Sequence, residues 1–136
     1  MKLTIEKQIC ESFGIKLAYL FGSAARGDAH NKDVDVAVLL DMRAPNPVME
    51  MDITEKLEKH LAKSQKDGPH PHISSLNSAN ALFRFEAIKE GRVLYAASEE
   101  ERIDFEMRVI REYGDYKAKS RFYETALRER LRDRSA

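Results

Sequence analysis

Residues 15–40, IKLAYLFGSAARGDAHNKDVDVAVLL, decide both the fold and the chemistry that this chain can support. The first part, IKLAYLF (15–21), is an apolar run of strand length that ends in Gly22 and Ser23. A tight turn at this point would expose backbone N–H groups and one hydroxyl at the start of a short helix. Helix N-termini bind phosphate, because free N–H groups and the helix dipole both favour negative charge. The first part therefore predicts a phosphate-binding turn.

The second part, DVDVAVLL (33–40), alternates acidic and apolar residues with a period of two. This period is typical of a strand and places Asp33 and Asp35 on one face, side by side. Adjacent carboxylates repel unless a cation lies between them, and their hard oxygens suit magnesium. A phosphate-binding turn beside a metal-binding pair predicts nucleotidyl transfer. The chain has no GxxxxGK[ST] motif, which excludes a P-loop as the phosphate binder.

The composition predicts one soluble domain with no general affinity for nucleic acid or membrane. The 136 residues include 23 basic and 23 acidic side chains, so the net charge is zero. Cys10 is the single cysteine, which excludes an intramolecular disulfide and favours a reducing compartment. The first residues have no apolar segment typical of a signal peptide, and no stretch is apolar enough to span a membrane. We expect a cytoplasmic protein.

The rest of the chain has the pattern of a small α/β domain followed by helices. Apolar spacing, caps and glycines predict further strands over 70–76 and 92–96 and helices over about 5–13, 47–61, 79–90 and 98–113. Gly114 is expected to interrupt the last of these helices, and Asp115 to start another. We therefore expect a core over residues 1–97 and C-terminal helices over residues 98–136 that pack on it.

The Gly-Ser and Asp-x-Asp pair resembles the signature of the DNA polymerase β-like nucleotidyltransferase superfamily, in particular the minimal nucleotidyltransferases (MNT). Two later runs, LNSANALFRFEAIKEGRVLYA (76–96) and FEMRVIREYGDYKAKSRFYETALRERL (105–131), are similar to MntA-type antitoxins of HEPN/MNT toxin–antitoxin pairs. The resemblance implies a nucleotidyltransferase fold, with a small mixed sheet flanked by helices and a C-terminal helical tail. It also implies transfer of AMP from the substrate ATP to a tyrosine of a partner HEPN-family ribonuclease toxin, in an assembly with that toxin.

The resemblance also assigns roles to residues of the motif. Gly22 and Ser23 would hold the β- and γ-phosphates of ATP, and Asp33 and Asp35 would ligate two Mg²⁺ ions. Arg26 is close enough in sequence to reach a phosphate, but a solvated surface arginine is an equally good interpretation.

His72 stands where the family usually supplies a third acid, four positions before the leucine of the Leu-Asn pair. An imidazole is a poor ligand for magnesium, but it could accept a proton from the attacking hydroxyl. The alternative is that His70 and His72 are half-exposed strand residues without a catalytic role. Without a third acid the chain could also be a silent member of the family that neutralises the toxin by binding alone. Transfer to a small molecule is a third possibility.

The C-terminal segment permits two interpretations. Residues 115–134 carry seven basic and four acidic side chains, interleaved with Tyr116, Phe122 and Tyr123. Such a helix can form a nucleic-acid surface. Because its apolar residues keep helical spacing, we expect a surface for a protein partner and no direct binding of nucleic acid.

Overall fold

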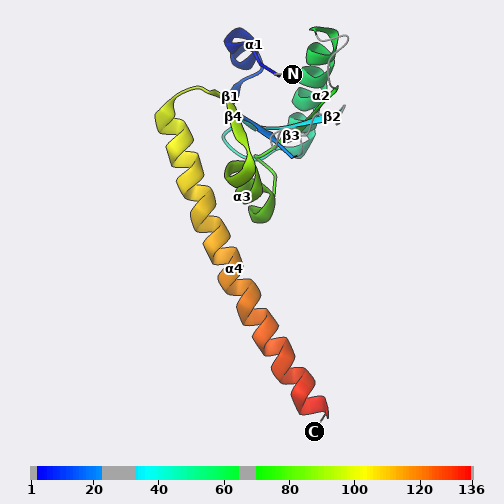
Figure 1. Cartoon of the computed structure of the whole chain (residues 1–136), viewed down its shortest axis with the longest axis vertical. Helices are drawn as coiled ribbons and strands as arrows, with labels where there is room; N and C mark the ends of the chain where they lie inside the picture. The colour runs from blue at the N-terminus through cyan, green and yellow to red at the C-terminus, as the bar shows by residue number, and fades with distance from the viewer. Residues whose placement is uncertain (1–2, 23–32, 65–69, 136) are drawn as a thin grey trace.

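A mixed four-stranded sheet forms the centre of the molecule, in the strand order β3-β2-β1-β4 (Figure 1). The computed structural model describes residues 3–22, 33–64 and 70–135. β1 (Ile15–Phe21) pairs antiparallel with β2 (Asp33–Leu40) and with β4 (Arg92–Ala96), whereas β3 (His70–Ser75) pairs parallel with β2. β3 is thus an edge strand, a position that tolerates Pro71, which has no N–H to donate to a neighbouring strand.

Helices cover both faces of this sheet. α1 (Lys7–Ser12) and α2 (Pro47–Ser64) contribute to the core on one face, and α3 (Ala81–Glu90) and α4 (Glu99–Ser135) contribute to the core on the other. The fold is therefore α+β with a mixed sheet flanked by helices, which confirms the predicted class.

The alternation of residues along β2 decides which face carries the candidate site. Val34, Val36 and Val38 lie in the core that α1 and α2 cover. Ala37 lies in the core on the α3 and α4 side. Because side chains alternate along a strand, Asp35 belongs to the same face as Ala37.

The predicted helix starts are set by side-chain caps. Asn46 Oδ1 accepts the N–H of Met49 at 3.2 Å, and Pro47 is the first residue of α2. Ser98 Oγ accepts the N–H of Glu101 at 3.1 Å at the start of α4. The start of α3 differs from the prediction, since Asn80 is the cap and the helix begins at Ala81 rather than residue 79.

The two predicted C-terminal helices are one. α4 runs without interruption through Gly114, so the expected break is wrong. A glycine inside a helix costs only about 1 kcal/mol, which good helix formers on both sides offset. Phe105 and Val109 are buried in the first half of α4, but the second half extends away from the body and does not pack on the core as expected (Figure 1). Within the described part of the chain no helix, α4 included, combines the length and apolar character needed to cross a bilayer.

Candidate active site

Gly22 and Asp35 meet where β1 ends and β2 begins. Gly22 directly follows β1 and has φ +78°, a conformation that glycine adopts without strain. The register pairs the neighbouring Phe21 with Asp35. A methyl group on Gly22 would lie 2.9 Å from Asp35 Oδ2, so the carboxylate would have to shift to admit any other residue. The sheet therefore brings together the two halves of the predicted motif, with the Asp35 carboxylate against the glycine backbone.

The Asp35 side chain is half-buried, and its carboxylate forms no hydrogen bond or ion pair with the residues that the structure describes. Asp33, the first residue of β2, precedes it by two residues in the same strand. The carboxylate oxygens of Asp35 suit a hard divalent cation such as Mg²⁺. Among the side chains that the structure describes, which do not include that of Asp33, no group of three potential ligands is arranged around a metal position.

His72 lies beside Asp35 in the sheet but turns toward the outer edge. The parallel register of β2 and β3 pairs Asp35 with His72 and Asp33 with His70. The imidazole is 70% exposed, and its Nδ1 lies 3.5 Å from Glu58 Oε1 on α2. The same Glu58 oxygen accepts the N–H of Ile73 at 2.7 Å. Glu58 therefore holds both the edge of β3 and one nitrogen of the His72 ring.

An aromatic pair borders the Gly22 turn. Phe21, at the end of β1, contacts Phe83 of α3 edge to face, with ring centroids 5.3 Å apart. Such a pair contributes about 1 kcal/mol beyond the area that it buries. The start of α3 is therefore fixed next to the end of β1.

Asn77 and Arg84 hold the segment between β3 and α3. Asn77 accepts the Leu40 N–H with Oδ1 at 2.8 Å and donates from Nδ2 to the Leu40 carbonyl at 2.9 Å, as a neighbouring strand would. The Arg84 guanidinium donates to the carbonyls of Leu76 and Asn77 at 2.8 and 2.7 Å. It also pairs with Glu112 of α4 at 3.0 Å. One arginine thus links the end of the sheet to both helices on the face of the candidate site.

Glu50 is a buried carboxylate in the same region. It is 2% exposed and accepts hydrogen bonds from the hydroxyls of Ser75 and Ser78 at 2.5 and 2.6 Å and from the N–H of Asn46 at 2.8 Å. Burial alone would raise the pKa of Glu50, but these hydrogen bonds outweigh it, and the pKa is lowered. Glu50 is therefore an anion that joins the start of α2 to the end of β3.

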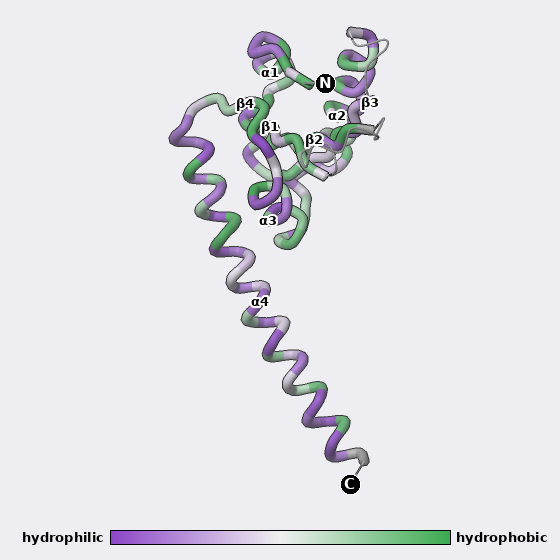
Figure 2. Tube along the Cα trace, viewed as in Figure 1, coloured by the Kyte–Doolittle hydropathy of each residue, from purple (hydrophilic) through white to green (hydrophobic). Residues whose placement is uncertain are grey.

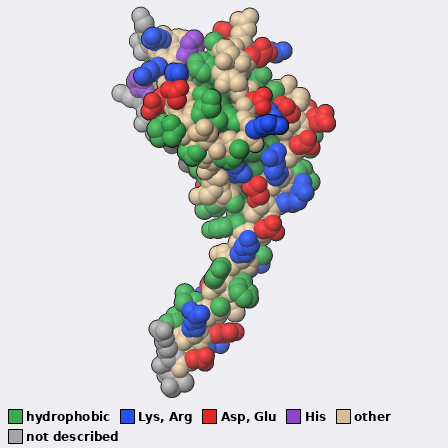
Figure 3. All heavy atoms as spheres, turned by 180° about the vertical axis from the view of Figure 1, so that it is seen from behind, with side chains coloured by type: hydrophobic (Ala, Val, Ile, Leu, Met, Phe, Trp, Pro, Cys, Tyr) green, Lys and Arg blue, Asp and Glu red, His purple; other side chains and the backbone are tan. Residues whose placement is uncertain are grey.

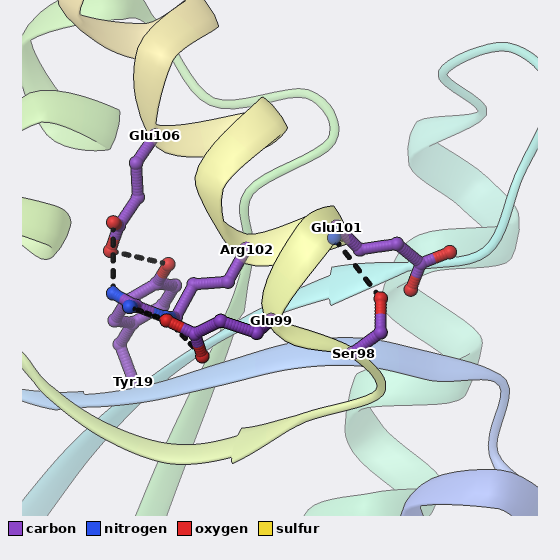
Figure 4. A network of polar contacts seen from close by, with 6 residues as sticks. All are labelled: Tyr19, Ser98, Glu99, Glu101, Arg102 and Glu106. Atoms are coloured by element: carbon purple, nitrogen blue, oxygen red, sulfur yellow. Dashed lines mark hydrogen bonds and ion pairs between the residues drawn. The ribbon is translucent and has the colours of Figure 1, made fainter.

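A second polar network ties β1 to α4 on the same face of the sheet (Figure 4). The hydroxyl of the fully buried Tyr19 donates to Glu106 Oε1 at 3.1 Å. Arg102 pairs with Glu106 at 3.0 Å and with Glu99. Burial, followed by the negative charge of Glu106, raises the pKa of Tyr19 well above its usual range. The phenol therefore stays neutral and acts as a structural donor.

The structure describes only part of the predicted constellation. It brings Gly22, Asp35 and His72 to one region of the sheet. Ser23, Arg26 and the side chain of Asp33 lie outside the described residues. The predicted roles of all these residues remain predictions.

Sequence reasoning missed the residues that support the site, which are Glu50, Glu58, Asn77 and Arg84. Glu50 and Glu58 look like ordinary solvated acids on an amphipathic helix, because nothing local reveals that β3 will lie beside them. The pair Leu76-Asn77 was visible in sequence, but its contact with Leu40 spans 37 residues.

Comparison with solved structures finds the same arrangement in chains of several toxin–antitoxin complexes. A toxin–antitoxin complex with AMP-PNP contains a chain that matches with a TM-score of 0.67 and 20% identity, covering 88% of this chain and 93% of that chain. A tri-AMPylated Shewanella oneidensis HEPN toxin in complex with its MNT antitoxin gives a TM-score of 0.60 and 20% identity, with coverage of 84% and 83%. The MntA–HepT toxin–antitoxin complex gives 0.59 and 20%, with 84% of each chain covered. At this identity the likeness shows the fold.

Comparison of the sequence itself identifies the family. No curated protein matches the chain. The family model described as polymerase beta, nucleotidyltransferase matches residues 4–100, which include the whole sheet and the meeting point of Gly22 and Asp35. The chain therefore belongs to the polymerase β nucleotidyltransferase family.

Proposed function

We propose that this chain is an antitoxin that transfers AMP from ATP to a tyrosine of a partner HEPN-family ribonuclease toxin and so neutralises it. The observation that carries the proposal is the contact between the Asp35 carboxylate and the Gly22 backbone, in a fold of the nucleotidyltransferase family. The resemblance to a complex that contains an AMPylated HEPN toxin, and to one that contains AMP-PNP, supports the choice of acceptor and of nucleotide.

The chain's own residues bind and orient the reactants. The backbone N–H groups at Gly22 and Ser23, with the Ser23 hydroxyl, bind the β- and γ-phosphates, and Arg26 adds a positive charge nearby. Asp33 and Asp35 hold magnesium, which when bound offsets phosphate charge and stabilises the attacking and leaving oxygens. The toxin tyrosine attacks the α-phosphate, and pyrophosphate leaves.

His72 is the proposed acceptor of the tyrosine proton. Its Nδ1 faces Glu58 at 3.5 Å, which leaves Nε2 as the nitrogen that can take the proton. The imidazole is 70% exposed, so an incoming side chain can reach it.

A second candidate function is neutralisation by binding alone. It is favoured by the same histidine, because β3 (His70–Ser75) contains no acid to complete the pair on β2, and the imidazole points to the outer edge. In that case Asp33→Asn and Asp35→Asn would leave neutralisation of the toxin intact.

The proposal is tested by incubating the chain with a purified HEPN-family ribonuclease, ATP labelled at the α-phosphate, and Mg²⁺. We expect label on the ribonuclease with the wild type and at least a hundredfold less with Asp35→Asn, since a metal-binding carboxylate is lost. Asp41→Asn is the matched control, because Asp41 is an exposed acid just beyond β2 that pairs with Lys16 at 3.5 Å.

The outcome separates the two functions. If the ribonuclease binds and is neutralised without label transfer, the chain acts by binding alone. If transfer persists unchanged in Asp35→Asn, the assignment of the site is wrong.

A further inference from the structure

An apolar stripe on α4 continues from the core into the part of the helix that leaves the body. Phe105 and Val109, which are buried, are followed at helical spacing by Tyr116, Tyr123 and Leu127. The spacings of four and seven residues keep all five on one face of the helix. The face that packs on the body in the first half is therefore the face that remains apolar in the second.

In the second half this stripe is open to solvent. The side chains of Tyr116, Tyr123 and Leu127 are 45%, 72% and 58% exposed. Figure 2 shows hydrophobic segments alternating with hydrophilic ones along the protruding part of the helix, and Figure 3 shows hydrophobic side chains on it among charged ones. In proteins, most helical stability comes from packing an apolar face against another surface rather than from helix propensity. The stripe therefore has the character of a contact surface.

Stacked aromatic rings fix the direction in which the helix leaves the body. Tyr113 stacks on Phe85 of α3 with ring centroids 3.8 Å apart, and Tyr116 follows at 6.2 Å from Tyr113. Lys89 and Lys117 lie over the Phe85 and Tyr113 rings at 5.9 and 5.4 Å. The open stripe thus begins at an ordered corner between α3 and α4.

The charges on the helix disfavour a second copy of the chain as the occupant. Residues 115–134 carry seven basic and four acidic side chains, so two such segments side by side would repel. Lys119 and Arg130 lie on the face of the stripe itself by their spacing from Tyr123. Two stripes packed together would therefore bring these basic side chains into one interface.

Packing of the stripe on the first half of α4 from a second copy does not give a closed dimer either. Its exposed apolar residues Ile103, Met107 and Ile110 lie on the opposite side of the helix from the stripe. If the stripe of one copy packed on these residues of a second copy, the second copy's own stripe would face away from the first. Such contacts would form an open chain of copies rather than a closed dimer.

We propose that the second half of α4 is the docking surface for the partner protein, and that it binds an acidic surface of that partner with an apolar centre. The inference rests on the proposed function, since the partner is the toxin that receives AMP. Tyr116, Tyr123 and Leu127 supply the apolar contact, while Lys119 and Arg130 pair with carboxylates beside it. The toxin is thus held by α4, apart from the residues that bind ATP.

The test compares two faces of the same helix in the full chain. Leu127→Glu introduces a charge on the stripe, and Thr125→Glu introduces the same charge on the opposite face. Arg130→Glu and Arg121→Glu form a second matched pair for charge reversal. Binding to the purified HEPN-family ribonuclease is measured by calorimetry, with circular dichroism to check that the helix is retained.

We expect Leu127→Glu to weaken binding at least about tenfold and Arg130→Glu a few-fold, with both controls within about twofold of wild type. Added salt should weaken wild-type binding and reduce the difference in affinity between the wild type and Arg130→Glu. Transfer of AMP by Leu127→Glu should recover at high partner concentration, because its active site is unchanged. Asp35→Asn should bind the partner as wild type does.

Several results would overturn this inference without touching the proposed function. If the wild type transfers label to the ribonuclease and Leu127→Glu binds the ribonuclease as tightly as the wild type does, the docking surface lies elsewhere. A dimer that dissociates on Leu127→Glu in light scattering would make a second copy the occupant. RNA binding lost in the same variant would make nucleic acid the ligand. If the wild type neither binds nor labels the ribonuclease, the proposed function itself fails.

Discussion

Gly22 and Gly14 have the same kind of backbone conformation, with φ of +78° and +67°, but only Gly22 touches the candidate site. Alanine at either position adopts an unfavourable left-handed conformation at a cost of about 1–2 kcal/mol. At Gly22 the added methyl also lies 2.9 Å from Asp35 Oδ2, whereas at Gly14 it meets nothing within 4 Å. We expect Gly22→Ala to lower AMP transfer at least about tenfold, and Gly14→Ala to lower only stability. Initial rates of AMP transfer and urea unfolding of both variants separate the effect on activity from the effect on stability. Equal transfer rates for Gly22→Ala and the wild type would contradict a role for the contact between Gly22 and Asp35.

Glu50 should make stability depend on pH. Its folded pKa is lowered, so the folded chain binds fewer protons than the unfolded chain, and the stabilisation is present above the ordinary value of 4.5 and lost as pH falls through the folded pKa. Glu50→Gln should lower the unfolding free energy by about 2 kcal/mol at pH 7, because hydrogen bonds to a buried charge are lost. The difference should shrink as pH falls through the folded pKa and Glu50 becomes protonated. Urea unfolding at pH 7 and at a series of lower pH values measures this, with the exposed Glu55→Gln on the same helix as control.

At the scale of residues, the sequence predicted which motif residues come together better than it predicted which residues support them. The approach of Gly22 to Asp35 followed from the motif, because both residues carry their signal locally. The burial of Glu50 did not, since its partners Ser75 and Ser78 are 25 and 28 residues away. Glu58 was missed for the same reason, as its contact with His72 depends on β3 lying beside α2.

Gly114 is the weak point of α4. It lies inside the helix with no atom within 4 Å of the position of an added Cβ. Gly114→Ala should therefore stabilise the helix by about 0.5–1 kcal/mol, through the higher helix propensity of alanine. Thermal unfolding followed by circular dichroism at 222 nm measures the change. A lower melting temperature would mean that the helix needs to bend at this residue.

The strands were predicted more accurately than the last helix. Residues 15–21, 33–40 and 92–96 were assigned to strands from their apolar patterns, and β1, β2 and β4 have these bounds. The prediction of a helix break at Gly114 was wrong, because a glycine ends a helix only where the chain also turns. Whether it turns depends on residues that follow, and Tyr116 to Leu131 continue the helical spacing. The short helix expected from Ser23 lies outside the described residues.

The whole molecule should be elongated in solution. A compact chain of 136 residues has a radius of gyration of about 14 Å. α4 has 37 residues, so at 1.5 Å per residue it alone is about 55 Å long. We expect small-angle X-ray scattering of the isolated chain to give a radius clearly above about 14 Å. A value near that limit would show that the second half of α4 folds back onto the body.

The fold class was accessible from sequence, but the shape was not. Alternating strand and helix patterns, together with the motif, predicted a mixed sheet flanked by helices. The protruding part of α4 has the same amphipathic spacing as a packed helix, so sequence alone assigned it to the core. Only the tertiary arrangement shows that its apolar face runs past the end of the body (Figure 1).

The edge of the sheet at β3 also affects how the molecule behaves at high concentration. An exposed edge strand offers free N–H and C=O groups on which a strand of another molecule can pair, the first step toward aggregation. Here Pro71 has no N–H to offer, and the N–H of Ile73, two residues along on the same edge, is already bound to Glu58 at 2.7 Å. The carboxylate that contacts His72 therefore also occupies an N–H that an added strand would need. A residue that supports the candidate active site thus protects the protein against edge-to-edge aggregation.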